Sequence, residues 1–403
     1  MTTEKEHLKG LNSEQKEAAM HTEGPLLIIA GAGAGKTKTI THRIVNLIKE
    51  GVAPERILAV TFTNKAAKEM RERIILEIEK NAKGQNSIPF VSTFHSLGVY
   101  IIKENAKALG LTKYFTILDD GDSTRFVKEA MGEIGIDPKQ YDPKKIKNII
   151  SREKGKFTHL SDYAERESRG VNTLGQRVAQ VWNLYEKKKA KENSLDFDDL
   201  LLKSTKLLQD NLEIRKIYQD KWEYIHIDEY QDTNEVQYLM SKLLSEKHKN
   251  IVVVGDADQN IYSWRGANLK NILNFEKDYP NSKIVMLEEN YRSTQNILEA
   301  ANVIIKKNKF RPDKNLFTKN DAGDKIGLYE ALDETDEADF VATKILEILD
   351  SKSTAREIAV LYRANFQSRA LEEAMLRYNI PYQVLGVKFF ERKEIKDTLA
   401  YLR

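Results

Sequence analysis

Short, nearly continuous apolar runs alternate with longer segments of helical periodicity along most of this chain. The apolar runs are Pro25–Ala30, Ile57–Phe62, Phe90–Thr93, Tyr224–Asp228, Ile251–Asp256, Ile284–Leu287, Ile326–Leu332, Ile358–Tyr362 and Tyr382–Leu385. Runs rich in Ile, Leu and Val are typical of strands that are covered on both faces. Strands that alternate with helices predict an α/β fold with parallel sheets.

The alternation stops between about Leu111 and Leu208, where strand signals are few and charge is high. We therefore expect a mostly helical insertion, at 111–194, in a first α/β domain formed by 1–110 and 195–281. The basic residues of this stretch favour a solvated helix face, and the alternative is a surface that contacts nucleic-acid phosphates. They are Lys144, Lys145, Lys147, Arg152, Lys154, Lys156 and the run Lys187–Lys188–Lys189.

A second α/β unit is expected to begin near Ser282 and to include the last four apolar runs. It is followed by Glu391–Arg403, in which Ile395, Leu399 and Leu402 share one helical face. No Gly, Pro or capping residue closes this pattern. We therefore expect 282–403 to be an incomplete second domain.

Composition excludes several classes of protein. The 403 residues contain no cysteine, which excludes disulfide scaffolds, iron–sulfur clusters and thiol catalysis. No apolar stretch approaches the ~20 residues that span a bilayer, and the charged N-terminus is no signal peptide, so we expect a cytoplasmic protein. With 64 Lys and Arg against 61 Asp and Glu, the net charge is only +3. Any binding of a polyanion must therefore depend on locally placed charges.

A glycine-rich turn follows the first apolar run and precedes a helical pattern. It reads Gly31-Ala32-Gly33-Ala34-Gly35-Lys36-Thr37, after Ala30. Backbone N–H groups of such a turn surround a phosphate, and the helix N-terminus adds a favourable dipole. Lys36 would reach the β- and γ-phosphates and the Thr37 hydroxyl would bind Mg²⁺. The usual pattern begins with Gly where Ala30 stands, a change that a small residue tolerates.

Two further strand ends carry polar groups. Asp228 and Glu229 follow the run that begins at Tyr224, and Gln259 follows the run that begins at Ile251. Ligands bind at the carboxyl ends of strands in open α/β sheets. Asp228 would help to hold Mg²⁺, and Glu229 would orient or deprotonate the attacking water. Gln259 would contact the γ-phosphate or that water, although it could also be a turn-stabilising amide.

The order of these motifs resembles that of the UvrD/Rep/PcrA-type superfamily 1 DNA helicases, most closely the PcrA-like members. The matching segments are Leu11–Gln15 (Q motif), Ala30–Thr37 (I), Thr61–Ala67 (Ia), Ser92–Ser96 (Ib), Leu195–Leu200, Asp228–Asp232 (II), Gly255–Ala267 (III) and Asn290–Thr294 (IV). The resemblance implies RecA-like motor lobes. It makes 1–110 with 195–281 domain 1A, 111–194 insertion 1B and 282–403 part of domain 2A.

The resemblance also implies roles for individual residues. Gln15 would recognise adenine, Tyr291 would stack on it, and Arg292 would approach the γ-phosphate as an arginine finger. Ala32, Gly33, Ala34, Gly35, Lys36, Thr37 and Lys38 would surround the nucleotide. Single-stranded DNA would lie along Phe62, Asn64, His95, Phe197, Tyr262, Trp264 and Arg265. Aromatic side chains suit this task independently, because base stacking tolerates any sequence. For Phe62 and Phe197 the alternative is core packing, and for His95 it is a loop histidine without a ligand.

The implied activity is an ATP- and Mg²⁺-dependent 3′–5′ DNA helicase of repair or replication. It would act as a monomer on single strands and on single-strand/duplex junctions. This chain departs from the family pattern in two respects. Lys38 stands where the family often has an adenine-stacking Arg, and motifs V and VI do not occur before Arg403. We therefore expect this chain to bind ATP and DNA but to unwind poorly alone.

Three alternatives stay open at this point. The first is a nucleotide-gated DNA- or protein-binding module without motor activity. The second is the helicase part of a helicase–nuclease. Asp196, Asp198 and Asp199 would be candidates for a nuclease metal site, although no other nuclease-like carboxylates lie near them in sequence. A P-loop ATPase that is not a helicase would leave Phe62, Trp264 and Arg265 unexplained.

Overall fold

The computed structural model describes residues 5–81, 87–170, 173–308, 314–351 and 353–385. It divides into two compact units, Met1–Gly323 and Asp324–Arg403, each of which is described by itself. None of the helices within the described ranges combines the length and the apolar character that crossing a bilayer requires.

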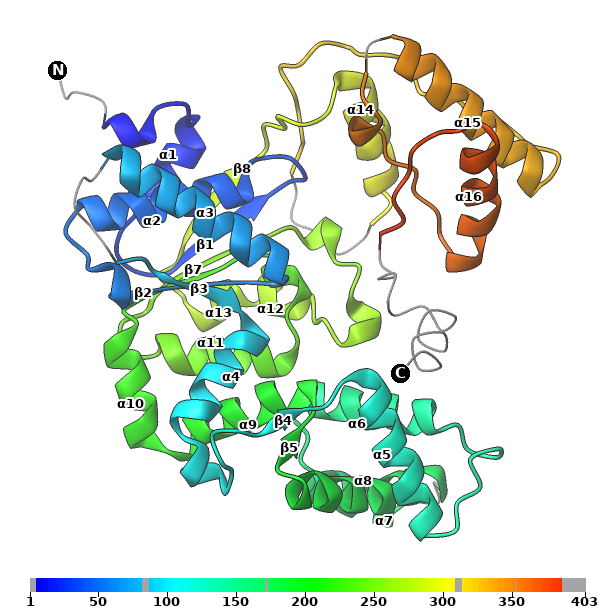
Figure 1. The fold of residues 1–403 in the computed structure, drawn as a ribbon. Helices are drawn as coiled ribbons and strands as arrows, with labels where there is room; N and C mark the ends of the chain where they lie inside the picture. Colours follow the sequence, from blue (N-terminus) through cyan, green and yellow to red (C-terminus); the bar gives the residue numbers. More distant parts are fainter. Residues whose placement is uncertain (1–4, 82–86, 171–172, 309–313, 352, 386–403) are drawn as a thin grey trace. The chain divides into compact units, whose positions relative to one another are not determined.

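The first unit is built on a six-stranded parallel sheet with the strand order β3-β2-β6-β7-β1-β8 (Figure 1). The strands are β1 (Leu26–Ala30), β2 (Ile57–Thr61), β3 (Phe90–Thr93), β6 (Tyr224–Ile227), β7 (Asn250–Gly255) and β8 (Lys283–Leu287). Each corresponds to an apolar run in the sequence, so these six strand predictions are confirmed. Because all neighbours are parallel, the carboxyl ends of the strands share one edge.

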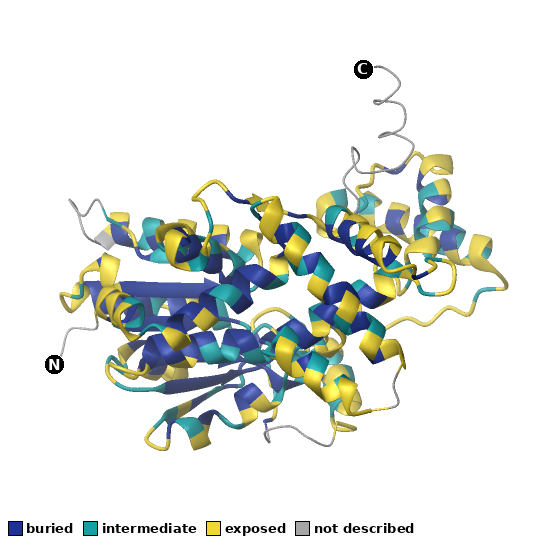
Figure 2. Ribbon diagram, turned by 90° about the horizontal axis from the view of Figure 1, so that it is seen from below, coloured by how far each residue is buried: buried dark blue, intermediate teal, exposed yellow. Residues whose placement is uncertain are grey.

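Helices cover both faces of this sheet. One face carries α1 (Ser13–Met20), α2 (Lys36–Lys49) and α3 (Asn64–Asn81). The other carries α4 (Phe94–Glu104), α9 (Phe197–Asp210), α10 (Leu212–Lys221), α11 (Glu235–Ser245), α12 (Lys270–Leu273) and α13 (Phe275–Asp278). Successive side chains of a strand point to opposite faces. Leu26 and Ile28 therefore enter one core, and Leu27 and Ile29 enter the other. Figure 2 shows the strands buried between these layers.

β8 begins next to the predicted domain boundary at Ser282 and belongs to the sheet of the first unit. β8 pairs with β1, with Leu26 opposite Lys283 and Ala30 opposite Leu287. The strand that was expected to open the second domain is therefore the edge strand of the first sheet. Its apolar side chains Val285 and Leu287 complete the core under α2, which a separate lobe would leave open. Helix α14 (Gln295–Ile305) follows it, and the two compact units divide only at Gly323.

Between α4 and α9 the described residues form four helices with a core of their own. They are α5 (Asp120–Glu133), α6 (Pro143–Gly155), α7 (Leu160–Ser168) and α8 (Thr173–Lys191). Asp119 and Asp142 cap α5 and α6, and Pro143 occupies the first turn of α6. A two-stranded parallel ladder of β4 (Thr116–Ile117) and β5 (Ser194–Leu195) closes the insertion onto α9. The helical character predicted for this stretch is present.

Two lysines of the insertion are buried, which corrects their interpretation as solvated or DNA-facing residues. Lys154 of α6 and Lys189 of α8 are each 1% exposed. The Lys154 ammonium lies 2.8 Å from carboxylate oxygens of Glu186, Asp196 and Asp199, and Lys189 contacts the same three carboxylates. Burial by itself lowers the pKa of Lys154, but Asp196 and Asp199 raise it well above its ordinary value. These ion pairs bind the insertion to the start of α9.

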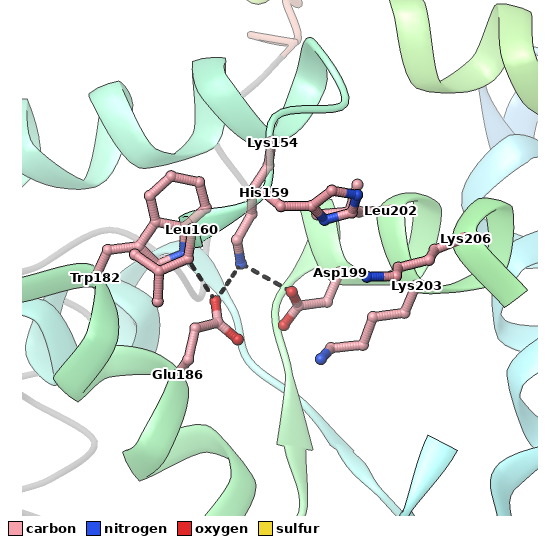
Figure 3. A pocket seen from close by; sticks show the side chains of 9 residues that line it. All are labelled: Lys154, His159, Leu160, Trp182, Glu186, Asp199, Leu202, Lys203 and Lys206. Atoms are coloured by element: carbon pink, nitrogen blue, oxygen red, sulfur yellow. Dashed lines mark hydrogen bonds and ion pairs between the residues drawn. The ribbon is translucent and has the colours of Figure 1, made fainter. Parts of the chain in front are cut away.

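The same ion pairs bear on the nuclease alternative. Oxygens of Glu186, Asp196 and Asp199 lie close enough together to hold a metal ion. The ammonium groups of Lys154 and Lys189 already form ion pairs with all three carboxylates, which favours a structural role. A cavity of about 190 Å³ beside them is lined by Trp182 and by side chains of α6–α9 (Figure 3). Burial raises the pKa of Glu186 and the two lysines lower it, with a net value of about 2.

The second unit contains α15 (Glu334–Asp350) and α16 (Ser368–Arg377), which pack through Ala338, Ala342, Ile345, Ala374, Met375 and Ile380. The strands predicted at 326–332, 358–362 and 382–385 are not formed. A strand requires a ladder partner, and within the described ranges these segments have none. Leu328 and Leu361 are accordingly more than 90% exposed. The helical pattern predicted at 391–403 lies outside the described residues.

Short 3-10 turns connect several elements. They are η1 (Glu6–Leu8), η2 (Pro54–Arg56), η3 (Ala106–Leu109), η4 (Tyr230–Asp232), η5 (Ala257–Gln259), η6 (Ser263–Arg265), η7 (Ala355–Glu357) and η8 (Asn365–Gln367).

Replacing Lys189 with Met should lower the free energy of unfolding by about 3–5 kcal/mol, because it leaves buried carboxylates without one of their two cations. Urea unfolding followed by circular dichroism measures this change. The matched control is Lys187→Met, two residues earlier on the exposed side of α8, which should change stability by no more than about 0.5 kcal/mol. Equal effects of the two substitutions would contradict a structural role for Lys189.

Candidate nucleotide and nucleic-acid site

The glycine-rich turn joins β1 to α2 and shapes a cradle of backbone N–H groups. Gly33 and Gly35 adopt positive φ angles of 69° and 81°, and α2 begins at Lys36. A Cβ atom on Gly35 would lie 2.7 Å from Nε2 of Gln15, and one on Gly33 would lie 2.9 Å from Cβ of Arg292. Both positions therefore require glycine for conformation and for space. The turn and the helix N-terminus together form an anion site.

Lys36 lies at the centre of the site. Its Nζ donates to Oε2 of Glu229 at 2.9 Å and to Oε1 of Gln259 at 3.4 Å. β1, β6 and β7 are neighbours in the sheet, so the residues that follow them meet at its carboxyl edge. The structure thus brings together three residues that the sequence placed up to 223 positions apart. A γ-phosphate could take the place of these contacts on the ammonium group.

Asp228 and Thr37 provide oxygen donors next to Lys36. The Thr37 hydroxyl donates to Oδ2 of Asp228 at 3.2 Å. Burial and the neighbouring Glu229 raise the pKa of Asp228 to about 6. A bound cation would favour the charged form of this carboxylate. A carboxylate and a hydroxyl are ligands that Mg²⁺ accepts, so the residues present fit the predicted metal.

Glu229 has an unusual backbone that aims its carboxylate at Lys36. Its φ is +53°, in the left-handed region that non-glycine residues seldom adopt. Strained conformations of this kind cluster at functional sites. Gln231 holds the carboxylate from the other side, because its Nε2 donates to Glu229 at 2.8 Å while its Oε1 accepts from the backbone N–H of Asp256 at 2.9 Å. Gln231 belongs to motif II, but the sequence did not indicate this bridging contact.

The residues expected to bind adenine lie beside the glycine-rich turn. Gln15 is 1% exposed, and its Nε2 donates to the carbonyl oxygen of Ala34 at 3.0 Å. Asn12 caps α1 and exchanges hydrogen bonds with Gln15 in a capping box. Gln15 thus fixes α1 against the turn in this structure. Lys38 donates to the carbonyl oxygen of Gly10 at 2.6 Å.

Motif IV, which follows β8, lies against the glycine-rich turn. The backbone N–H of Tyr291 donates to the carbonyl oxygen of Gly33 at 3.0 Å, and Nδ2 of Asn290 donates to that of Ala32 at 2.6 Å. Tyr291 is half exposed, and its hydroxyl donates to buried Glu289 at 2.9 Å. The side chain of Arg292 is exposed next to Gly33. Asn290 and Glu289 were not expected to take part. Asn290 belongs to motif IV but had no predicted role, and the only signal for Glu289 was its position next to that motif.

Two pairs of aromatic rings lie on the β2–β3 side of the sheet edge. Phe62, after β2, packs on Tyr262 with ring centroids 5.0 Å apart. His95, at the start of α4, meets Phe197 edge-on at 5.9 Å. Phe197 is 51% exposed, so the core-packing alternative does not apply to it. Burial lowers the pKa of His95, which keeps it neutral at physiological pH.

The remaining predicted DNA contacts are near these pairs in sequence. Trp264 is 74% exposed, two residues after Tyr262. Asn64 is exposed at the first position of α3. The side chain of Arg265 lies outside the described part of the structure. Exposed aromatic side chains next to polar groups are the arrangement that stacks nucleic-acid bases.

Comparison with known families agrees with this site. The model of the UvrD/REP helicase N-terminal domain matches residues 11–280, which is more than half of the chain. The chain belongs to the UvrD/REP helicase family. A second model, of the UvrD-like helicase C-terminal domain, matches residues 285–403. The predicted family and the α/β fold class with RecA-like parallel sheets are therefore confirmed.

Similar proteins come from several bacteria. Three relatives named ATP-dependent DNA helicase PcrA are 48% identical (Leuconostoc citreum), 47% identical (Staphylococcus epidermidis RP62A) and 46% identical (Staphylococcus aureus Mu50). Each alignment covers 98% of this chain and 52–54% of the relative. This UvrD/REP family chain thus spans about half the length of the curated relatives it matches.

Replacing Gly35 with Ala should weaken ATP binding about tenfold, because the new Cβ displaces Gln15 and distorts the phosphate cradle. Isothermal titration calorimetry with ATP measures the affinity. The control is Gly51→Ala, which has a similar positive φ of 97° but open space around it. It should lose comparable stability without losing affinity. Equal affinities in the two variants would show that the contact with Gln15 is unimportant.

Proposed function

We propose that this chain is the ATP- and single-stranded-DNA-binding part of an ATP-dependent DNA helicase that moves 3′–5′ along one strand. The observation that carries the proposal is the contact of Lys36 with both Glu229 and Gln259 at the edge that also bears the aromatic pairs. A phosphate cradle and aromatic groups at the same sheet edge, of which Phe197 and Trp264 are exposed, suit a nucleotide-driven motor. The names of the PcrA relatives agree with this assignment.

Hydrolysis of ATP is assigned to residues around the cradle. Lys36 would bind the β- and γ-phosphates, and Glu229 would accept the proton of the attacking water. Gln259 would contact the γ-phosphate or that water. Arg292 would stabilise the charge that develops on the transferred phosphoryl group, an effect of about 10³–10⁵ in rate where such a finger operates. Mg²⁺, held by Thr37 and Asp228, would neutralise phosphate charge.

Recognition of the base is assigned to Gln15 and Tyr291, with Lys38 nearby. The ring of Tyr291 is exposed for stacking, and Glu289 orients its hydroxyl. Lys38 has an ammonium group instead of a planar guanidinium, so it would contribute charge and little stacking. Gln15 would need to exchange one of its internal hydrogen bonds for adenine.

DNA would lie across the aromatic pairs Phe62–Tyr262 and His95–Phe197, and over Trp264. A neutral His95 adds a flat ring and no charge, which suits contact with bases. Asn64 and Arg265 would contact sugar or phosphate groups. We propose single strands and single-strand/duplex junctions as substrates, in DNA repair or replication.

A second candidate function is a nucleotide-gated DNA-binding module without motor activity. The observation that favours it is the set of internal contacts of Gln15 and Lys38, which occupy groups that a turnover cycle would use. The two candidates differ in whether DNA accelerates hydrolysis.

Replacing Trp264 with Ala should remove most of the stimulation of ATP hydrolysis by oligo(dT). It should also weaken DNA binding by about 1–3 kcal/mol, the usual contribution of one stacked base. Steady-state ATPase rates and fluorescence anisotropy provide the measurements. Tyr114→Ala is the matched control, because Tyr114 is 93% exposed and outside the proposed path. If the unmodified chain hydrolyses ATP slowly and oligo(dT) does not change the rate, the DNA-binding module without motor activity is favoured.

Replacing Lys36 with Ala should reduce affinity for ATP at least tenfold, since the ammonium contacts to the phosphates are lost. Equilibrium dialysis with labelled ATP would detect the change, and Lys49→Ala, at the far end of α2, serves as the control. Undiminished binding by the Lys36 variant would contradict the assignment of the phosphate site.

A further inference from the structure

A buried lysine that the family motifs do not include lies next to the nucleotide site. Lys314 follows α14, and its side chain is 2% exposed. Its Nζ forms an ion pair with Asp256 and lies 3.1 Å from Oδ2 of Asp258. Asp256 is itself 2% exposed. A buried carboxylate requires a cationic partner, and among the ion pairs of the described residues Lys314 is that partner.

Asp256 in turn determines how Gln259 is oriented. Oδ2 of Asp256 accepts a hydrogen bond from Nε2 of Gln259 at 2.6 Å, while Oδ1 accepts from the backbone N–H of Asp258 at 3.0 Å and from Lys314. A charged carboxylate can only accept hydrogen bonds. It therefore obliges the amide of Gln259 to present its nitrogen to Asp256 and its oxygen to the opposite side.

The opposite side of that amide faces the phosphate-binding lysine. Oε1 of Gln259 accepts from Nζ of Lys36 at 3.4 Å, and an ammonium group can only donate. The two charged neighbours thus permit only one orientation of the amide. In this orientation Oε1 is the atom available to a water molecule beside a γ-phosphate.

We propose that Lys314 is a positioning residue for Gln259, which it orients through Asp256. The inference rests on the proposed function, because it assumes that Gln259 contacts the γ-phosphate or its water. Without Lys314 the carboxylate of Asp256 would be left buried and uncompensated one side chain away from the phosphates. Gln259 would then lose the fixed acceptor that orients its amide toward the γ-phosphate, a group that ADP lacks.

The test compares the affinities of ADP and of a non-hydrolysable ATP analogue, so it does not require turnover. In Lys314→Met the preference for the analogue over ADP should fall roughly fivefold to tenfold, about what one buried hydrogen bond contributes. The affinity for ADP should change less than about twofold. Lys314→Arg keeps the charge and should retain most of the preference.

Combining Lys314→Met with Gln259→Ala distinguishes a positioning role of Lys314 from a merely structural one. Gln259→Ala should lose the same preference as Lys314→Met, and the double variant should be no worse than Gln259→Ala alone. The matched control is Lys242→Met, which breaks the ion pair of Lys242 with Asp278 (2.9 Å) in the same unit. It should leave the preference unchanged.

A second variant covers the case in which Lys314→Met does not fold. The pair Asp256→Asn with Lys314→Met removes both charges of this ion pair, so Asp256 is not left as an uncompensated carboxylate, and only Asp258 loses its contact with Lys314. Its side-chain amide at position 256 can donate or accept, so it no longer dictates the orientation of Gln259. This variant should also lose the preference for the analogue.

Three results would overturn the inference. They are a preference that survives in the folded Lys314→Met variant, equal losses of ADP and analogue affinity, and fully additive effects with Gln259→Ala. If the unmodified chain binds neither nucleotide, the proposed function fails and this inference falls with it. A preference that is present in the unmodified chain and unchanged in the variant contradicts the role of Lys314 alone.

Discussion

The parallel pairing of β1 with β7 on one side and with β8 on the other is the constraint on which the nucleotide site depends. Adjacent strands lie about 4.8 Å apart, so the turns that leave their carboxyl ends must be neighbours. The glycine-rich turn after β1 is therefore flanked by Asp256–Gln259 and by Asn290–Arg292. The hydrogen bonds from Asn290 to Ala32 and from Tyr291 to Gly33 are consequences of that pairing. A one-strand change in the sheet order would separate all three groups.

Lysine side chains of the first unit are paired with their partners in two physically different ways. Lys154 and Lys189 are enclosed by Glu186, Asp196 and Asp199, so carboxylates of the protein already pair with both ammonium groups. Lys36 has a carboxylate on one side and a neutral amide on the other, so a phosphate can compete for its ammonium group. Ion pairs of the first kind stabilise an architecture, and those of the second kind prepare a binding site. The net charge of +3 describes neither of them.

The sequence predicted what depends on local chemistry. The six strands of the first sheet are continuous apolar runs because both their faces are covered. The conformation of the glycine-rich turn depends only on the residues of the turn itself. It did not predict features that depend on distant partners. Nothing in 283–287 indicates that its ladder partner is β1, and Lys187, Lys188 and Lys189 look alike until α8 is packed. The run at 326–332 has the composition of a strand, but composition does not supply a neighbour for it. Lys314 lies outside every motif, and only the fold brings it to Asp256.

In the proposed motor, the bound nucleotide must change the position of the DNA-binding residues. The chain after β7 is the shortest connection between the nucleotide site and those residues. Gln259, Tyr262 and Trp264 lie within one segment that is anchored at both ends. Asp256 caps η5 at its start, and at its end the N–H of Asn268 donates to the carbonyl oxygen of Thr233. Because both ends of the segment are fixed by hydrogen bonds, a shift of Gln259 toward or away from a γ-phosphate would displace the exposed residues between them. There Tyr262 packs on Phe62, the residue after β2, which carries the displacement to the end of that strand. Such a connection becomes coupling only if the segment has two arrangements of similar free energy, and its exposed position gives it the freedom to have them.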